Sequence, residues 1–301
     1  MRMEKALWPH SELKNHVKLA RFTSWRVGGP AERLFQPSSK EDLVGFLAAL
    51  PEREPLTLLG LGSNVLVRDG GVPGTVILTS GLRRLFLEQG RIYVEAGVPC
   101  AHVARFCLEH GLSGGEFLAG IPGSFGGALA MNAGAFGGET WDWVEEVETA
   151  DRHGKVYRRS RCEYQVGYRN VQGPAGECFL AAWLRFAPGD PEAGRWRIRH
   201  LLTQRYKTQP MGWPSCGSVF KNPEGEKAGR LIEVCGLKGK RIGLAKISEV
   251  HANFILNLGG AQAADIEALI CLAQAEVQVR FGIRLEPEVK ILGVGGRNET
   301  D

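Results

Sequence analysis

The sequence lacks the marks of several protein classes. It has no run of 18 uninterrupted apolar residues that could span a membrane, and its N-terminus has no apolar run typical of a signal peptide. Its seven cysteines are odd in number and include no CxxC pair, which argues against a zinc site and against a disulfide framework. We therefore expect a cytoplasmic protein with reduced thiols, no metal site and no membrane partner.

The chain also lacks a block of basic residues. Its 301 residues include 37 Lys and Arg against 33 Asp and Glu, which gives a formal charge of +4, and the two signs are mixed along the chain. Nucleic-acid binding usually requires a basic stripe, so we expect no nucleic-acid partner. With 44% hydrophobic residues, the chain can bury a substantial core and form two or three domains.

Glycine, in contrast, is concentrated. Residues 111–138 contain ten of the 40 glycines, interleaved with large apolar residues. A second glycine-rich element, GLGSN at 60–64, lies between two apolar runs. Glycine lets main-chain N–H groups approach a ligand closely, and successive turns can aim several of them at one anion. Two such loops suggest a long, phosphate-bearing ligand that is held at two places.

Neither loop fits a common nucleotide motif. In a Rossmann fingerprint a third glycine would stand where this chain has Val65 and a helix would follow, but the residues after Val65 favour a strand. No GKS or GKT indicates a P-loop. GLGSN is therefore either a simple tight turn or a nest of donors between two strands. The longer loop favours ligand binding, since an ordinary connection rarely needs ten glycines.

The first 81 residues predict a small α/β unit. Ser39 and Asp42 form a capping pattern before a helical run that Pro51 ends. Short apolar runs bounded by glycine are typical of strands, which we expect at 56–59, 65–67 and 75–78.

Strands predominate from Leu82 to Pro188. We expect them at 92–95, 144–149, 155–158 and 179–186. One helix has Pro99 near its first turn and Gly111 as its C-terminal cap. The segment 187–194 contains two prolines and two glycines and is the expected linker.

An α+β unit follows the linker. A basic helix is expected over 195–207, and apolar residues at helical spacing predict a longer one over 264–281. Strands are expected at 218–221, 253–257 and 285–292. The polar, glycine-rich tail 294–301 is expected to be disordered.

Six segments, in this order, resemble one protein family. They are TSWRVGGPA at 23–31, GLGSNVLV at 60–67, AGIPGSFGGALAMNAGAFGGE at 119–139, GYR at 167–169, CGSVFKNP at 216–223 and LEPEVKILG at 285–293. Each segment is weak evidence alone, but together they are highly specific and the likeness spans residues 15–293. The sequence is similar to the UDP-N-acetylenolpyruvoylglucosamine reductases, also called UDP-N-acetylmuramate dehydrogenases.

The resemblance implies an α+β fold with two FAD-binding subdomains of the flavin-oxidase type, at 1–81 and 82–188, and a substrate-binding domain at 189–293. FAD would be held non-covalently and reduced by NADPH. The flavoenzyme, a monomer, would then reduce a small-molecule partner, the sugar nucleotide UDP-N-acetylglucosamine enolpyruvate, to UDP-N-acetylmuramate for peptidoglycan. The residues that would bind the cofactor are Gly60, Gly62, Ser63, Asn64, Gly120, Ile121, Pro122, Gly123, Ser124, Gly126, Gly127, Asn132, Gly134 and Ala135.

Three catalytic roles carry over from the resemblance. Hydride addition to an enolpyruvyl ether places negative charge on the neighbouring carbon and its carboxylate. Arg169 would bind that carboxylate through bidentate donors, Ser218 would donate the proton, and Glu288 would stabilise the enol. Without the resemblance, Arg169 would be a surface residue, Ser218 a turn residue, and Glu288 part of the solvent face of an edge strand.

The same resemblance assigns substrate contacts. They fall on Asn222, Lys207, Arg205 and Tyr168, where Lys207 requires a one-residue gap and Arg205 and Tyr206 compete with it for the diphosphate. His251 and Asn253 also match family positions, but they could equally be polar residues satisfied within the fold.

Two departures from the family pattern stand out. Val171 replaces a frequent serine near Arg169, and the short segment 171–178 resembles the subgroup without a tyrosine-bearing loop.

Two other functions are also compatible with the sequence. One is a related flavin oxidase that shares only the FAD subdomains, and the other is a flavin- or nucleotide-binding regulator without turnover. A role for Cys216 as a nucleophile is disfavoured, because no histidine stands at a supporting spacing.

Overall fold

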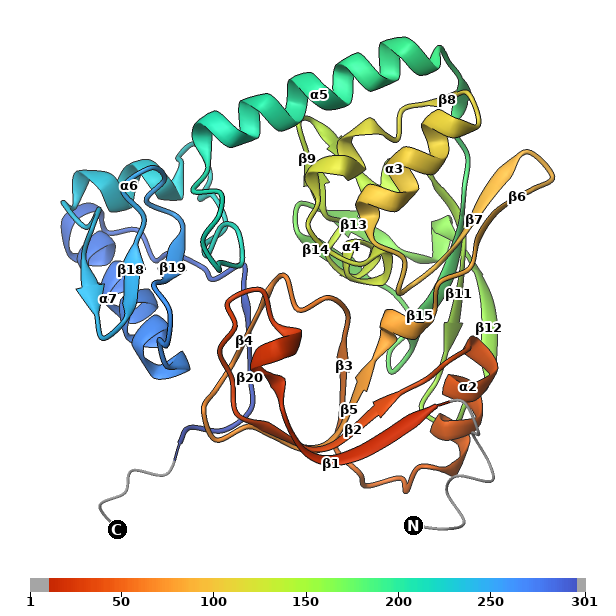
Figure 1. The fold of residues 1–301 in the computed structure, drawn as a ribbon, viewed down its shortest axis with the longest axis horizontal. Coiled ribbons are helices and arrows are strands. Elements are labelled where there is room, and N and C mark those ends of the chain that lie inside the picture. The colour runs from red at the N-terminus through yellow and green to blue at the C-terminus, as the bar shows by residue number, and fades with distance from the viewer. Residues whose placement is uncertain (1–10, 297–301) are drawn as a thin grey trace. The chain divides into compact units, whose positions relative to one another are not determined.

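The computed structural model describes residues 11–296 and contains two compact units (Figure 1). Within the described residues, unit 1 comprises 11–14, 34–61 and 75–205, and unit 2 comprises 15–33, 62–74 and 206–296. Each unit is therefore built from segments that are distant in sequence. The division into three domains at residues 81 and 188 stays a prediction.

The N-terminal sheet has the strand order β1-β2-β5-β3, with strands β1 (Glu12–Lys18), β2 (Pro30–Gln36), β3 (Leu56–Leu59) and β5 (Val72–Leu78). Strand β3 pairs in parallel with β5. Helix α2 (Lys40–Ala49) is capped by Ser39, whose side chain accepts a hydrogen bond from the amide of Asp42, and Pro51 follows its end. The predicted cap and strands are confirmed here.

The larger sheet of unit 1 is antiparallel, with the order β12-β11-β15-β7-β6. Its strands are β6 (Leu85–Glu88), β7 (Arg91–Glu95), β11 (Val144–Ala150), β12 (Val156–Ser160) and β15 (Cys178–Leu184). Helices α3 (Cys100–Glu109) and α4 (Phe125–Met131) share one buried apolar cluster with β7, β11 and β15. Pro99 precedes α3, and Gly111 beyond its end has φ +64°, as predicted.

Shorter elements complete unit 1. Two-residue strands form the pairs β8 (Leu112–Ser113) with β16 (Ala187–Pro188) and β9 (Gly134–Ala135) with β10 (Gly138–Glu139), while β13 (Gln165–Gly167) pairs with β14 (Asn170–Gln172). The 3-10 helices of the described chain are Leu19–Phe22, Thr79–Gly81, Glu116–Gly120, Thr140–Asp142 and Arg161–Glu163.

The predicted linker at 187–194 is wrong. Its first residues form strand β16, and helix α5 (Pro191–Thr208) begins inside it. The carboxylate of Asp190 accepts hydrogen bonds from the amides of Glu192 and Ala193, and Pro191 occupies the first helical position, where a missing N–H is harmless. An acidic N-cap followed by proline was the sequence signal for this helix start.

In unit 2, helices α6 (Ala228–Val234) and α7 (Ala263–Phe281) accompany the sheet β17-β18-β19, and β4 pairs in parallel with β20. The strand bounds are β4 (Val65–Val67), β17 (Arg241–Ile242), β18 (Ala245–Ile247), β19 (Ile255–Asn257) and β20 (Lys290–Leu292). The predicted helix at 264–281 is confirmed as α7, which begins one residue earlier and ends at the predicted residue.

Three strand predictions in unit 2 need correction. No strand forms at 218–221, and the strands expected at 253–257 and 285–292 shrink to β19 and β20. Val219 and Phe220 instead form hydrogen bonds with the backbone and side chain of Asn253. Val219 also accepts one from the amide of Glu288, in the segment before β20. Val294, placed by the sequence in a disordered tail, exchanges hydrogen bonds with Gly70 and Gly71; residues 297–301 of that tail lie outside the described range.

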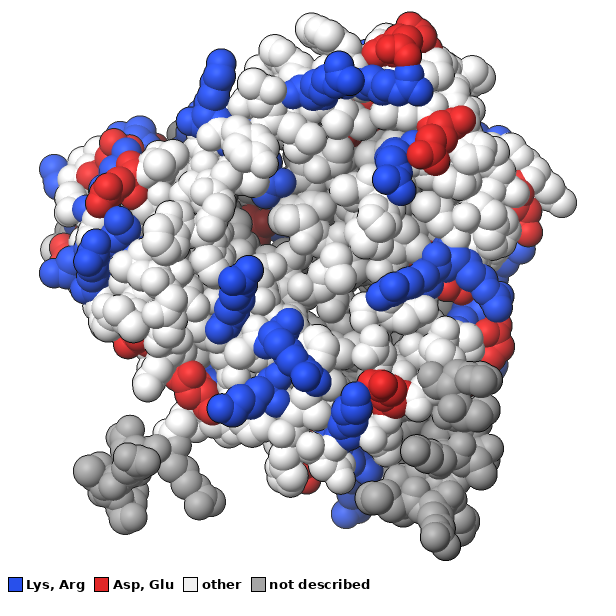
Figure 2. Space-filling view, viewed as in Figure 1, with Lys and Arg blue, Asp and Glu red and all other residues white. Residues whose placement is uncertain are grey.

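Charge is dispersed over the surface in view. Lys and Arg side chains lie singly or in small groups between uncharged residues (Figure 2). No helix within residues 11–296 combines the length and apolar character needed to cross a membrane.

Candidate active site

The two glycine-rich loops meet in unit 1. A Cβ atom on Gly60 would lie only 2.2 Å from the hydroxyl oxygen of Ser124, so the first loop touches the second where only glycine fits. Gly60 precedes the turn of GLGSN, and Ser124 caps helix α4. This contact supports the prediction that both loops serve one ligand.

Residues 62–64 of GLGSN belong to unit 2, and Gly62 lies in a bend that leads into a turn. Gly62 has φ +63°, and a Cβ there would lie 2.0 Å from the carbonyl oxygen of Phe22. Asn64 follows Ser63 and turns its side chain toward the C-terminal segment: its Nδ2 donates to the carbonyl of Glu288 at 3.1 Å. Position 62 therefore requires glycine for steric reasons. The side chain of Asn64 holds the main chain of Glu288, a proposed catalytic residue.

The second loop contains helix α4, which no pattern in the sequence predicted. Ser124 accepts from the amide of Gly127, while the amides of Phe125 and Gly126 donate to the carbonyls of Val98 and Ala96. A Cβ on Gly126 would lie 2.7 Å from the Cβ of Ala96. These early amides of the helix are therefore already bonded within the protein, and Gly126 serves close packing.

The approach to α4 is fixed by neighbouring elements. The carbonyl of Gly120 accepts a hydrogen bond of 2.8 Å from Nη1 of Arg205 in α5, and the carbonyl of Gly123 accepts one of 2.9 Å from the amide of Cys100. Between them, Ile121 is buried and Pro122 is exposed. Arg205, predicted to meet substrate, thus also supports the loop.

Asn132 ends α4 in a left-handed conformation and is almost fully buried. Its Nδ2 donates to Glu139 and to the carbonyl of Gly167, and its Oδ1 accepts from the amide of Trp141. This asparagine therefore connects the glycine loop to the hairpin that carries Arg169. Gly134 and Ala135 follow as strand β9.

Arg169 occupies the turn of the hairpin β13–β14. It has φ +52°, a conformation that glycine or asparagine usually takes, and Tyr168 beside it is half exposed. Its guanidinium contacts the carbonyls of Asn132 (3.4 Å) and Gly134 (3.3 Å). A strained arginine beside the glycine loop is consistent with a functional role for its side chain.

Ser218 lies in the irregular segment of unit 2 between Cys216 and Phe220. Cys216, Val219 and Phe220 are buried, but Ser218 is only half-buried, and Gly217 before it has φ +74°. A bend at Gly217 thus precedes Ser218, and the buried neighbours anchor the segment in the core.

Glu288 belongs to the same local structure. Its amide donates to the carbonyl of Val219 at 2.8 Å, which places the segments of Ser218 and Glu288 side by side. Asn222, predicted to meet substrate, accepts a hydrogen bond from the amide of Ala228 at the start of α6. Within unit 2 the structure thus gathers Ser218, Asn222 and Glu288 around residues 216–223.

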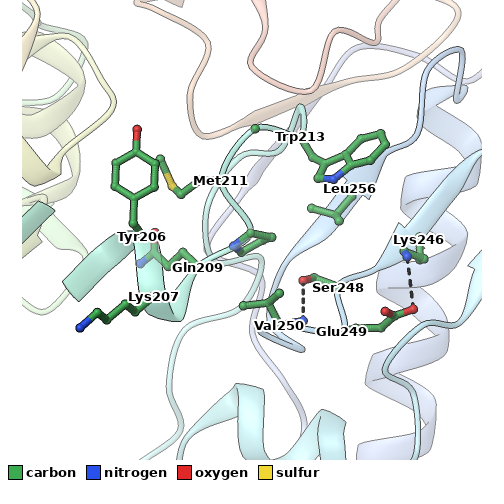
Figure 3. Close-up of a pocket in the computed structure, with 12 residues that line it drawn as sticks. Tyr206, Lys207, Gln209, Met211, Trp213, Lys246, Ser248, Glu249, Val250 and Leu256 are labelled. Atoms are coloured by element: carbon green, nitrogen blue, oxygen red, sulfur yellow. Dashed lines mark hydrogen bonds and ion pairs between the residues drawn. The ribbon is translucent and has the colours of Figure 1, made fainter. Parts of the chain in front are cut away.

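Lys207 borders a separate cavity of about 640 Å³ in unit 2 (Figure 3). The exposed rings of Tyr206 and Trp213 line it, together with Ser248 and the ion pair of Lys246 with Glu249. In the close-up the ammonium group of Lys207 points outward, away from the other lining residues. Lys207 therefore borders the cavity, and its contact with substrate stays a prediction.

Burial explains two shifted pKa values near the site. It raises the pKa of the Cys216 thiol to about 12, so this cysteine stays protonated and is no thiolate nucleophile at neutral pH. Burial, together with the charge of Lys238, lowers the pKa of His251. Its Nδ1 accepts a hydrogen bond from the amide of Asn253, as the neutral ring allows.

The comparisons with known proteins agree with this geometry. Residues 31–160 match the FAD binding domain, and residues 209–292 match the C-terminal domain of UDP-N-acetylenolpyruvoylglucosamine reductase. Fold and site define a flavin-dependent oxidoreductase with a dedicated C-terminal domain. The close contact of the two glycine loops and the arginine beside them fit a large anionic cofactor such as FAD.

Full-length relatives establish the family. UDP-N-acetylenolpyruvoylglucosamine reductase of Alkalilimnicola ehrlichii is 58% identical, covering 97% of this chain and 98% of its own, and that of Methylococcus capsulatus is 59% identical over 92% of each. The crystal structure of the Thermus caldophilus reductase superposes with a TM-score of 0.81 at 36% identity, covering 94% of this chain and 99% of that one. The chain belongs to the UDP-N-acetylenolpyruvoylglucosamine reductase family.

Proposed function

We propose that this chain reduces UDP-N-acetylglucosamine enolpyruvate to UDP-N-acetylmuramate, a precursor of peptidoglycan, with FAD as cofactor and NADPH as reductant. One observation carries the proposal. The match to the reductase C-terminal domain covers residues 209–292, which contain Ser218, Asn222 and Glu288. A flavin oxidase that shared only the FAD-binding region would not need these residues.

The reaction adds two hydrogens across a C=C bond. When bound, FAD takes hydride from NADPH and supplies it to the terminal carbon of the enolpyruvyl group. The π electrons of the double bond then form the second C–H bond with a proton from the hydroxyl of Ser218, which regains a proton from solvent. Serine is a weak acid, so the hydroxyl must be held in line with a strongly basic carbon.

Arg169 and Glu288 stabilise the charge that develops. A guanidinium offers two parallel donors to the carboxylate next to the reacting carbon, and its interaction strengthens as that carboxylate takes up negative charge. The turn conformation of Arg169 fixes where these donors originate. Glu288 stabilises the enol form, and Asn64 and Val219 hold its main chain.

Binding roles fall to the remaining predicted residues. The glycine loops around Gly60 and Ser124 would hold the cofactor, with Arg205 supporting the second loop through Gly120. Lys207 would meet the substrate diphosphate, assisted by Asn222 and Tyr168.

Absorbance spectroscopy tests the proposal directly. The purified protein should be yellow, NADPH should bleach the flavin band, and the enolpyruvyl sugar nucleotide should restore it with formation of UDP-N-acetylmuramate by mass spectrometry. Restoration by oxygen alone, with no effect of the sugar nucleotide, would instead indicate a flavin oxidase with another substrate. A colourless protein, or one that NADPH does not bleach, would contradict the proposal.

The cellular setting is also proposed. All seven cysteines, which lie within the described residues, are free thiols, and this is consistent with a reducing cytoplasm. A monomer is expected, and light scattering of the purified protein would test it.

A further inference from the structure

We infer that Asn253 is a positioning residue for the proton-donating step, because its side chain and carbonyl together fix the backbone that follows Ser218. The inference rests on the proposed role of Ser218 and adds a residue that acts through it. The sequence indicated for Asn253 only a match to a family position or a polar residue that is satisfied within the fold.

Three hydrogen bonds carry the inference. The amide of Val219 donates to the carbonyl of Asn253 at 2.9 Å, the amide of Phe220 donates to Oδ1 of Asn253 at 3.0 Å, and Nδ2 of Asn253 donates to the carbonyl of Phe220 at 2.8 Å. One buried residue thus satisfies three polar groups of the two residues after Ser218. The side chain replaces the sheet partner that the sequence predicted for residues 218–221.

The opposite side of this segment is fixed as well. The amide of Glu288 bonds to the carbonyl of Val219, and buried Cys216 lies before Gly217 with its thiol near the carbonyl of Val65. The side chain of Asn253 holds the segment differently, because it pairs with both main-chain polar groups of a single residue, Phe220. The hydroxyl of Ser218 therefore depends on Asn253 for its direction relative to Glu288.

Asn253 is itself held rigidly. It is 3% exposed, and its amide donates to Nδ1 of His251. The turn before it is closed by the hydroxyl of Ser248, which accepts from the amides of Val250 and His251. A rigid support of this kind is what precise placement of a proton donor requires, since a shift of 1 Å can slow a reaction about 10²-fold.

The chain offers a matched control. Asn257 is equally buried at 3%, and its side chain makes three hydrogen bonds, to the carbonyl of Trp25 and from the amides of Gly259 and Ala261, against two for the side chain of Asn253. It contacts neither the Ser218 segment nor Glu288 through these bonds. Asn257→Ala should therefore lower stability as Asn253→Ala does, with no specific effect on the proton transfer.

The experiment measures the two half-reactions by stopped flow in FAD-loaded protein. Asn253→Ala should leave bleaching by NADPH unchanged and slow reoxidation by saturating enolpyruvyl substrate about 10²-fold. Asn257→Ala should leave both rates unchanged. The double variant Ser218→Ala/Asn253→Ala should be no slower than Ser218→Ala, because Asn253 acts through a hydroxyl that is already missing.

The outcomes separate the two claims. If Ser218→Ala slows reoxidation but Asn253→Ala does not, or if the two effects multiply in the double variant, the inference is overturned and the proposed function stands. If Ser218→Ala reoxidises normally, the proposed role of Ser218 fails, and the inference with it. Should Asn253→Ala not fold, the nearly isosteric Asn253→Asp, which keeps the acceptor but loses the donor to Phe220, gives the same readout: normal reoxidation at saturating substrate would overturn the inference.

Discussion

The main-chain amide of Glu288 donates a hydrogen bond of 2.8 Å to the carbonyl oxygen of Val219. Val219 directly follows Ser218, so this bond joins the segments of two proposed catalytic residues within unit 2. Arg169 belongs to unit 1, where its guanidinium contacts carbonyls of the glycine loop. The two sets of contacts can be tested independently.

Replacement of Ser218 by alanine should separate the two half-reactions. Flavin reduction by NADPH should stay nearly intact, because it needs no proton from Ser218. Reoxidation by the enolpyruvyl substrate should slow about 10²- to 10⁴-fold, the usual contribution of a general acid. Rapid-mixing absorbance at the flavin band measures both steps, and normal reoxidation would remove Ser218 from its role.

Two replacements of Arg169 should lower activity alike but differ in stability. Arg169→Ala and Arg169→Gly should both slow reoxidation at least about 10²-fold, by analogy with loss of an oxyanion donor. Because φ is +52°, the glycine variant should be more stable than the alanine variant by about 1 kcal/mol. Urea unfolding gives the stability difference. Equal stability would show that the backbone is not strained here, and retained activity would assign the charge-stabilising role elsewhere, for example to Arg205.

Local signals in the sequence predicted most of the helices. The cap at Ser39, the proline before α3 and the apolar spacing in α7 act within a few residues, so they can be recognised without knowledge of the fold. Helix α4 was missed because Gly126 and Gly127 lower its helix propensity. It is held in place by distant carbonyls of Ala96 and Val98, which no local pattern reveals.

The site shows the same division. Ser218, Arg169 and Glu288 stand in short motifs that the family resemblance assigns. The contacts of the residues that support this site cannot be recognised in such motifs. Asn253 donates to the carbonyl of Phe220 and Arg205 donates to the carbonyl of Gly120, and each of these hydrogen bonds joins segments that are far apart in sequence. The strand expected at 218–221 failed for this reason, since the residues of that segment cannot show that their backbone partner is an asparagine side chain.

Gly60→Ala should weaken retention of FAD. The added Cβ would lie 2.2 Å from the hydroxyl oxygen of Ser124, so one of the two glycine loops must shift. Overpacking of this kind destabilises by about 1–3 kcal/mol. The flavin content after gel filtration and the thermal midpoint should both fall. Ser124→Ala in the Gly60→Ala background removes the clashing oxygen and should recover part of the loss; no recovery would show that the contact with Ser124 is not the cause.

Arg205 and Lys207 should affect different ligands, although they are two residues apart. Arg205 donates to the carbonyl of Gly120, so Arg205→Ala should lower the affinity for FAD measured by titration of the apoprotein. Lys207 lies at the rim of the unit 2 cavity, so Lys207→Ala should raise KM for the sugar nucleotide and leave FAD binding unchanged. The reverse pattern would exchange the two assignments.

His251 should make stability depend on pH. Burial and the charge of Lys238 lower its pKa below the usual 6.5, so the unfolded chain takes up a proton more readily than the folded protein. This contribution to the free energy of unfolding is fully present above pH 6.5 and is lost as pH falls from 6.5 toward the folded pKa. In His251→Asn the side-chain oxygen can still accept from the amide of Asn253 but does not titrate. Between pH of about 7.5 and 5.5, urea unfolding should therefore show a smaller decrease in stability for the variant than for the unmodified protein, while an equal decrease would mean that other groups govern this pH range.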